Sequence, residues 1–248
     1  MTYSLIQTEH LSKRFDLEAG FFARNRRTVY AVSDVSFSIR QGETYGLVGE
    51  SGCGKTTTAR LLAGMYKADG GRVLYSPDTD TSGRESDRKD ISLFSSRELK
   101  AYREQIKYIF QDPARSLNPR MNVYEILTAA LRYSSYWRGE QDARKRAIHI
   151  IEEVGLTAAD LERRPSDFSG GQRQRISIAR GLIMEPRLLI CDEIVSALDV
   201  SIQGQILNLL QSIRSQRNLS FLFIAHDLKV SCWFCDRIGV MYRGELVE

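Results

Sequence analysis

The chain has 248 residues, of which 42% are apolar and 27% are charged, a composition typical of a soluble globular protein. Its net charge of +4 is too small to indicate nucleic acid as a partner, although it allows a mildly basic face near an anionic membrane. No apolar run approaches the ~20 residues that span a bilayer, and the first residues lack the charged and apolar regions of a signal peptide. We therefore expect one cytosolic domain.

The first fifth of the chain has the pattern of β-strands. In residues 33–40 the apolar Val35, Phe37 and Ile39 alternate with polar neighbours, which predicts a half-buried strand. Residues 5–11 can pair with it in a small antiparallel sheet. Residues 44–48 form a buried strand that leads into the next motif.

Residues 49–56 match the pattern G-x-x-x-x-G-K-[ST] of a phosphate-binding loop. Glycines allow backbone N–H groups to turn toward an anion, the lysine adds a positive charge, and the hydroxyl can bind Mg²⁺. The helix expected to follow points its positive end at the same place. The loop consists of Gly49, Glu50, Ser51, Gly52, Cys53, Gly54, Lys55 and Thr56.

The middle of the chain is more polar and then helical. Residues 76–90 contain no large apolar side chain and predict a solvated, mobile loop, whereas residues 106–110 predict a strand. From 123 to 161 apolar residues recur at helical spacing. The basic residues 144–146 within this region fit a solvated helix face better than a phosphate-binding patch.

The strand pattern returns in the last quarter, at 187–191 and 220–225, with helices expected near 171–184 and 201–216. Buried strands that alternate with helices indicate a parallel sheet covered on both faces. We therefore expect an α/β fold with a phosphate-loop core (about 1–111 and 166–248), a mainly parallel sheet, an N-terminal antiparallel β subdomain and an inserted helical subdomain (about 112–165).

Two carboxylates, Asp192 and Glu193, follow the apolar strand at 187–191. Ligands gather at the carboxyl ends of strands in open α/β sheets, so Asp192 can hold Mg²⁺ together with Thr56. Glu193 should then reach the attacking water.

Two further patterns allow more than one interpretation. Ser169, Gly170, Gly171 and Gln172 begin a helix and form either an exposed anion site or an ordinary N-cap. The pair Cys232 and Cys235 has the C-x-x-C spacing of metal and redox sites. Two helix positions whose side chains pack as small apolar groups explain this spacing better than a metal or redox site does.

Taken together, these motifs resemble the ATP-binding cassette family of transport ATPases over nearly the whole chain. The motifs are, in chain order, residues 49–56, Gln111, residues 168–172, the pair Asp192 and Glu193, residues 196–199 and His226. Residues 110–113, 116–120 and 196–203 further resemble the branch that imports peptides, opines or nickel. Ile194 stands where this family usually has proline, and Phe168 where it usually has leucine.

The resemblance implies ATP and Mg²⁺ as ligands, with each ATP held between two cassettes packed head to tail. Catalysis would use Glu193 as base or water-orienting group, with His226, Gln111 and Lys55. Mg²⁺ would be bound by Thr56, Gln111 and Asp192. Nucleotide contacts would come from Phe15 on the adenine, from the phosphate loop with Thr57, and from Ser169, Gly170, Gly171, Gln172 and Asp199.

The resemblance also implies partners and a place in the cell. These are integral membrane permease subunits, a second ATPase that is a copy or a paralogue, and, indirectly, an extracytoplasmic substrate-binding protein, with no nucleic acid. The chain would lie on the cytoplasmic face of a bacterial plasma membrane. The alternatives are a cassette ATPase that acts on nucleic acid or ribosomes, a non-hydrolysing regulatory module, and a phosphate-loop kinase, against which the motif at 169–172 speaks. The sequence leaves the transported molecule open.

Overall fold

The computed structural model describes residues 4–17, 27–76 and 88–248, so most of the loop expected at 76–90 lies outside the described residues. The chain divides into two compact units. The first comprises residues up to Leu99 together with Ser220–Glu248, and the second comprises Lys100–Leu219.

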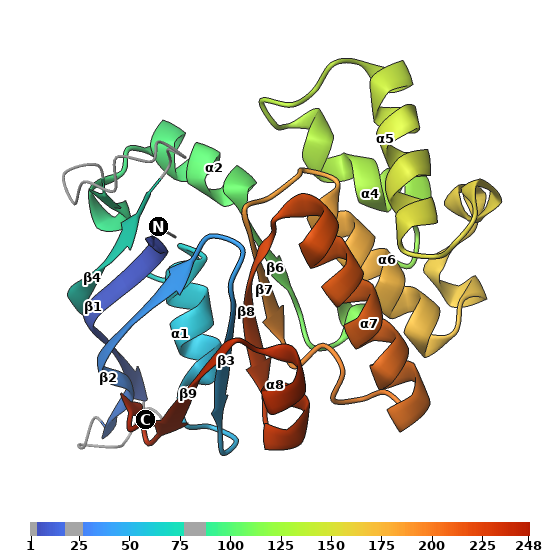
Figure 1. Cartoon of the computed structure of the whole chain (residues 1–248). Helices are drawn as coiled ribbons and strands as arrows, with labels where there is room; N and C mark the ends of the chain where they lie inside the picture. Colours follow the sequence, from blue (N-terminus) through green and yellow to red (C-terminus); the bar gives the residue numbers. More distant parts are fainter. Residues whose placement is uncertain (1–3, 18–26, 77–87) are drawn as a thin grey trace, which may run out of the picture. The chain divides into compact units, whose positions relative to one another are not determined.

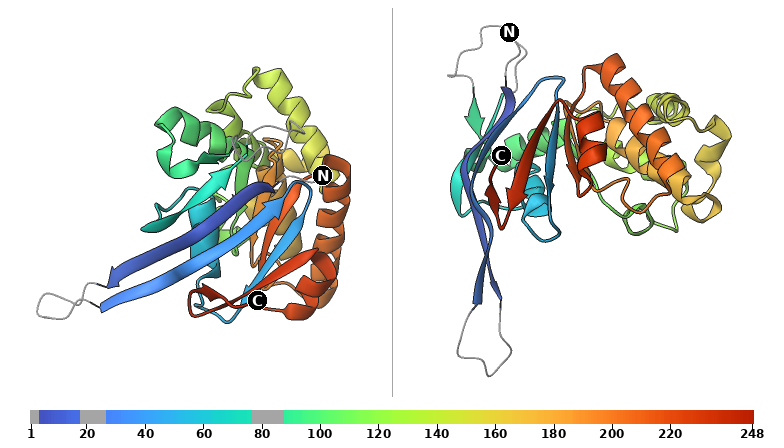
Figure 2. Two further views of the ribbon diagram at one scale, coloured as in Figure 1. Left: turned by 60° about the vertical axis from the view of Figure 1, so that its left-hand side comes forward. Right: turned by 60° about the horizontal axis from the view of Figure 1, so that its bottom comes forward.

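Within its described residues, the first unit contains a four-stranded antiparallel sheet in the order β2–β1–β4–β5 (Figure 1). Its strands are β1 (Ser4–Leu17), β2 (Arg27–Arg40), β4 (Gly70–Tyr75) and β5 (Lys89–Asp90). Figure 2 shows β1 and β2 running side by side. In their antiparallel register Thr8 lies opposite Phe37. The alternation in β2 buries Val35, Phe37 and Ile39, as the sequence predicts.

The same unit holds parallel strands. The buried β3 (Thr44–Gly49) pairs in parallel with both β8 (Ser220–Ala225) and β9 (Arg237–Tyr242). The short β10 (Glu245–Leu246) runs antiparallel to β9. Every residue of β8 is buried, which explains why its sequence is continuously apolar rather than alternating.

The helical elements of the first unit are α1 (Lys55–Leu62), the 3₁₀ turn η2 (Ile91–Leu93) and α8 (Leu228–Phe234). The ring of Phe234 lies 4.9 Å from that of Phe223 in β8, which fixes α8 on this strand. Cys232 is exposed on α8, whereas Cys235 caps its end and packs near Gly46. The two cysteines therefore do not share the buried helix face that the sequence suggests.

The second unit has two parallel strands, β6 (Ile106–Ile109) and β7 (Leu188–Asp192). Helix α2 (Ser96–Gln105) leads into β6. The remaining helical elements are α3 (Pro113–Ser116), α4 (Val123–Arg132), α5 (Glu140–Glu153), η3 (Ala158–Glu162), η4 (Pro165–Asp167), α6 (Gly170–Leu182) and α7 (Val200–Arg217).

The helices of this second unit pack on one another, with α4 and α5 both contacting α6, and α6 contacting α7 (Figure 1). Their apolar residues form the core, including Leu127, Ile151 and Ile176. The basic residues 144–146 lie on α5, where Arg144 pairs with Glu162 and Arg146 with Asp142. Lys145 is exposed, whereas Arg144 and Arg146 are half-buried in these ion pairs, so the face is solvated only in part.

The expected α/β fold is thus confirmed, with parallel strands, an antiparallel N-terminal sheet and a group of helices. The sequence did not predict β4, β9 or α2, which lack a distinctive apolar pattern. In the described part of the chain, no helix combines the length and apolar character that crossing a bilayer requires.

Candidate functional site

The loop after β3 has a backbone that only glycine can adopt at key positions. Gly54 has a φ of +110°, and a Cβ there would lie 2.2 Å from the carbonyl oxygen of Ala31. A Cβ on Gly49 would lie equally close to the carbonyl oxygen of Met241. The glycines of the phosphate-loop pattern therefore let the loop turn tightly while it packs against β2 and β9.

Lys55 begins α1 and is 4% exposed. Its Nζ donates hydrogen bonds to the carbonyl oxygens of Gly49 (2.7 Å) and Glu50 (2.8 Å). The side chain thus curls back over its own loop, which holds the positive charge at the start of α1. No acidic side chain lies in the first turn of α1 and no side chain caps it, so the field at this helix end favours an anion.

The other predicted residues of the phosphate loop and of the first turn of α1 differ in exposure. Glu50, Ser51 and Gly52 are exposed, and Thr56 and Thr57 are half-buried in the first turn of α1. Cys53 is buried, with its Sγ 3.7 Å from Lys55 Nζ.

Phe15, the residue expected to stack on adenine, is half-buried in β1. Its ring meets that of Tyr66 edge-on, with centroids 5.7 Å apart, and Lys13 Nζ lies 5.5 Å from its centroid. Phe15 is therefore not a core phenylalanine, which leaves its stacking role a prediction.

His226, predicted to contact the γ-phosphate, lies in the first unit directly after β8 and is exposed. The next residue, Asp227, caps α8 by accepting a hydrogen bond from the backbone N–H of Lys229 at 2.8 Å. The cap fixes where α8 begins and hence where the chain turns at His226.

The paired carboxylates of the second unit differ in conformation. Asp192 ends β7 and is 5% exposed, and its Oδ2 accepts a hydrogen bond of 2.5 Å from the Tyr108 hydroxyl. Glu193 has a φ of +50°, in the left-handed region that non-glycine residues seldom adopt. Ser196 donates to the Glu193 carbonyl oxygen through its backbone N–H (3.1 Å) and its hydroxyl (2.8 Å), which stabilises this turn.

The turn brings Glu193 to Gln111, which follows β6. Gln111 Nε2 donates to Glu193 Oε2 at 2.8 Å, across 82 positions of sequence. Two residues predicted to take part in catalysis are therefore in direct contact. Strained backbone at such a position is typical of functional sites.

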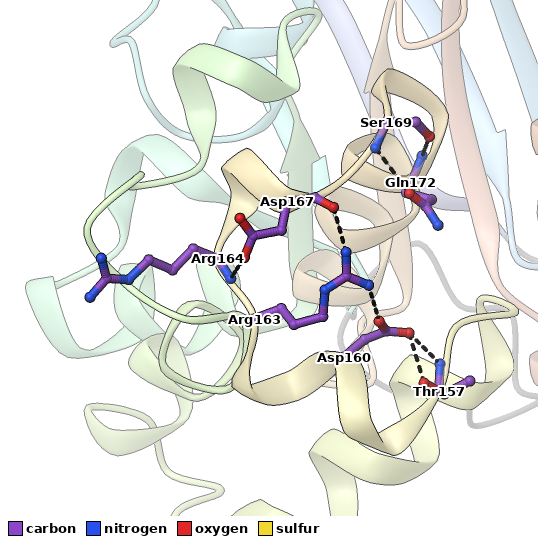
Figure 3. A network of polar contacts seen from close by, with 7 residues as sticks. All are labelled: Thr157, Asp160, Arg163, Arg164, Asp167, Ser169 and Gln172. Atoms are coloured by element: carbon purple, nitrogen blue, oxygen red, sulfur yellow. Dashed lines mark hydrogen bonds and ion pairs between the residues drawn. The ribbon is translucent and has the colours of Figure 1, made fainter.

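Ser169 forms a capping box with Gln172 at the start of α6 (Figure 3). The Ser169 N–H donates to Gln172 Oε1 at 2.9 Å, and the Gln172 N–H donates to Ser169 Oγ at 3.3 Å. The ordinary N-cap is thus present, while Ser169 and Gly170 remain exposed and able to face a ligand. The anion site stays a prediction.

The packing of α6 against α7 also requires glycine at position 171. A Cβ there would lie 2.8 Å from Cγ2 of Ile202 in α7, so Gly171 allows α6 and α7 to approach. Asp199, predicted to contact nucleotide, is exposed at the start of α7.

A polar network fixes the chain that enters α6 (Figure 3). Asp160 accepts from the Thr157 N–H (2.9 Å) and hydroxyl (2.8 Å) and pairs with Arg163 at 2.7 Å. The Thr157 backbone N–H is the main cause that lowers the pKa of Asp160, with Arg163 adding to it. Arg163 also donates to the Asp167 carbonyl oxygen and lies 4.3 Å from the centroid of Phe168. An aromatic residue at 168 thus gains a cation–π contact.

The donor set fits Mg²⁺ bound together with a nucleotide better than a resident metal. The described residues contain no group of three or more His, Cys, Asp or Glu that could hold a metal ion. The residues predicted to hold Mg²⁺ offer a carboxylate (Asp192), a hydroxyl (Thr56) and an amide (Gln111), which is the chemistry expected when phosphates and water supply the remaining oxygen ligands.

Sequence reasoning missed Tyr108, Arg163 and the left-handed conformation of Glu193. Tyr108 and Arg163 reach their partners through strand register and loop structure, for which the sequence offers no local signal. Ile194, the departure from the usual proline, is 2% exposed and fills the core.

Comparison with known proteins identifies a matching family and similar proteins. Residues 32–196 match the family model described as ABC transporter. The chain is 44% identical over its full length to 76% of the "Oligopeptide transport ATP-binding protein OppF" of Bacillus subtilis. It is also 44% identical, over 98% of the chain and 70% of the relative, to the protein of that name from Escherichia coli.

Solved structures of the same family are similar in fold. A dimeric bacterial ABC transporter cassette has a TM-score of 0.80 and 26% identity, with 98% of this chain and 97% of that one covered. A second is cbiO1 of Clostridium perfringens, described as part of the ABC transporter complex cbiONQ. It has the same TM-score and 25% identity, with 99% and 88% covered.

Proposed function

The chain belongs to the ABC transporter family and is an ATPase of that family, and we propose that it powers an importer of oligopeptides. The main observation that supports this proposal is the 44% identity to an oligopeptide transport ATP-binding protein across all 248 residues. The relatives described above are named for oligopeptides, which favours peptides over opines or nickel as cargo.

The predicted site residues can be given roles in hydrolysis. The loop at 49–56 and Lys55 bind the phosphates, and Phe15 packs on the adenine. Glu193 accepts a hydrogen bond from the attacking water and takes its proton as the water adds to the γ-phosphorus and the bond to the β-phosphate oxygen breaks. His226 holds the γ-phosphate in line for this step.

Gln111 supports Glu193 in this mechanism. The 2.8 Å hydrogen bond from its amide nitrogen restricts the carboxylate to one orientation. The amide oxygen is then directed away from Glu193. Thr56, Asp192 and Gln111 would hold Mg²⁺, which supplies charge neutralisation to the phosphates when bound.

The exposed start of α6 supports a proposal for the assembly. Ser169, Gly170, Gly171 and Gln172 would contact an ATP bound by a second cassette, either a copy or a paralogue, together with Asp199. Membrane permease subunits would dock on the pair, and a substrate-binding protein would deliver peptide to them from outside. In this proposal the chain would lie on the cytoplasmic face of the membrane. We also propose residues 112–165 as a helical insert in the cassette, since α3, α4, α5 and η3 lie within them.

Substitution of Glu193 tests the chemistry. Glu193→Gln keeps the shape of the side chain and its contact with Gln111, but it removes the base. We expect MgATP binding within two-fold of the wild-type protein and ATP turnover lower by about 10²–10⁴, the usual contribution of a positioned base. Glu153→Gln, in an ion pair with Arg217 away from these motifs, is the matched control.

Reconstitution tests the cargo. Permease subunits and a substrate-binding protein of an oligopeptide importer are placed in proteoliposomes with this chain, and uptake of a labelled oligopeptide, a dipeptide and Ni²⁺ is measured. ATP-dependent uptake of the oligopeptide supports the proposal. Uptake of Ni²⁺ alone, or ATPase activity stimulated by nucleic acid instead of by permease, would refute it.

A further inference from the structure

Tyr108 is a hydrogen-bond partner of Asp192 that sequence motifs do not predict. In the parallel pair of β6 and β7, Tyr108 lies opposite Ile190. Side chains alternate along a strand, so Ile190 and Asp192, two positions apart, share a face of β7 with the side chain of Tyr108.

The length of tyrosine matches the gap that this register leaves. Two residues along a strand advance by about 6.6 Å. A tyrosine leaning along the strand spans such a distance from Cα to hydroxyl, so it reaches from the level of Ile190 to the carboxylate of Asp192. The observed separation from Oη to Oδ2 is 2.5 Å, at the short end for a hydrogen bond to a carboxylate.

The surroundings hold this hydrogen bond in place. The Tyr108 ring packs against that of Phe110, with centroids 4.8 Å apart. Asp192 is 5% exposed, so little water competes for its oxygen. A short hydrogen bond between a packed ring and a buried carboxylate restricts the rotation of that carboxylate.

We propose that Tyr108 is a positioning residue that orients the Asp192 carboxylate for the divalent cation of the nucleotide. This inference rests on the proposed function, in which Asp192 is a cation ligand. Partners that orient a metal ligand through a hydrogen bond commonly change metal affinity or activity 10–100-fold when removed. The hydroxyl therefore matters for the affinity of the cation, whereas the ring contributes packing.

The test is Tyr108→Phe, which removes the hydroxyl and retains the ring against Phe110. Tyr133→Phe is the matched control, because Tyr133 is 80% exposed at the end of α4. Mn²⁺ is the probe. Its binding to each purified variant with ADP is followed by electron paramagnetic resonance, and nucleotide binding in EDTA is measured by calorimetry.

We expect Tyr108→Phe to weaken Mn²⁺ binding about ten-fold and to raise the Mg²⁺ concentration for half-maximal ATPase activity by a similar factor. ADP affinity in EDTA and the unfolding profile should stay close to those of the control. Unchanged or tighter Mn²⁺ binding would overturn the inference, as would an equal loss of nucleotide binding in EDTA. In those cases an active wild-type enzyme leaves the proposed function intact. A wild-type protein with no ATPase activity would instead refute that function.

Discussion

Replacing Gly171 with alanine separates the packing role of this glycine from its proposed role at the nucleotide. The added Cβ would lie 2.8 Å from Cγ2 of Ile202, and β-branched Ile202 has little freedom to move aside. Overpacking of this kind costs ~1–3 kcal/mol, whereas alanine in a helix gains ~1 kcal/mol over glycine. The two effects oppose each other in the single variant.

A double-mutant cycle resolves them. In a background of Ile202→Ala, which removes the Cγ2 atom, Gly171→Ala should show only the helix-propensity gain. The effect of Gly171→Ala should therefore differ by ~1–3 kcal/mol between the two backgrounds. Each kcal/mol corresponds to a shift of roughly 2–4 °C in Tm for a chain of this size.

Chemical denaturation and ATPase activity are measured on the four proteins of the cycle. We expect the double variant to recover stability relative to the sum of the single changes but to stay low in activity, because residue 171 belongs to the segment proposed to contact the partner nucleotide. No coupling in stability would refute the packing argument. Full recovery of activity in the double variant would show that the glycine serves packing alone.

Three further predictions concern single side chains. Gly54→Ala should abolish nucleotide binding, measured by calorimetry, and destabilise the chain by more than ~1 kcal/mol, measured by denaturation. The reason is that a Cβ has no room at this position, where φ is +110°. Near-normal binding would contradict this. The pKa of Asp160 is lowered in the folded protein, chiefly by the hydrogen bond from the Thr157 N–H. The stability that its carboxylate contributes is therefore complete above the pKa of Asp160 in the unfolded chain, ~4, and is lost as pH falls through the pKa in the folded protein. The stability gap between wild type and Asp160→Asn should accordingly shrink in acid, and a gap that widens there would count against it. Phe168→Leu should cost ~0.5–1 kcal/mol through loss of the Arg163 contact and leave ATPase activity unchanged in a steady-state assay, whereas lost activity would indicate a direct role.

The sequence alone determined the features that depend on neighbouring residues. The continuous apolar runs at β3, β7 and β8 predicted buried parallel strands, and alternation predicted β2. The glycine spacing of residues 49–56 predicted a phosphate loop because positive φ angles there require glycine. These signals are local, since backbone conformation and periodicity are set within a few residues.

The tertiary structure decided which distant side chains meet. The contact of Tyr108 with Asp192 depends on the register of β6 against β7, and that of Gln111 with Glu193 on a left-handed turn held by Ser196. The need for glycine at 171 comes from Ile202, 31 positions later, across two packed helices. No window of sequence contains such pairs, because strand register and helix approach are fixed by the packing of the whole unit.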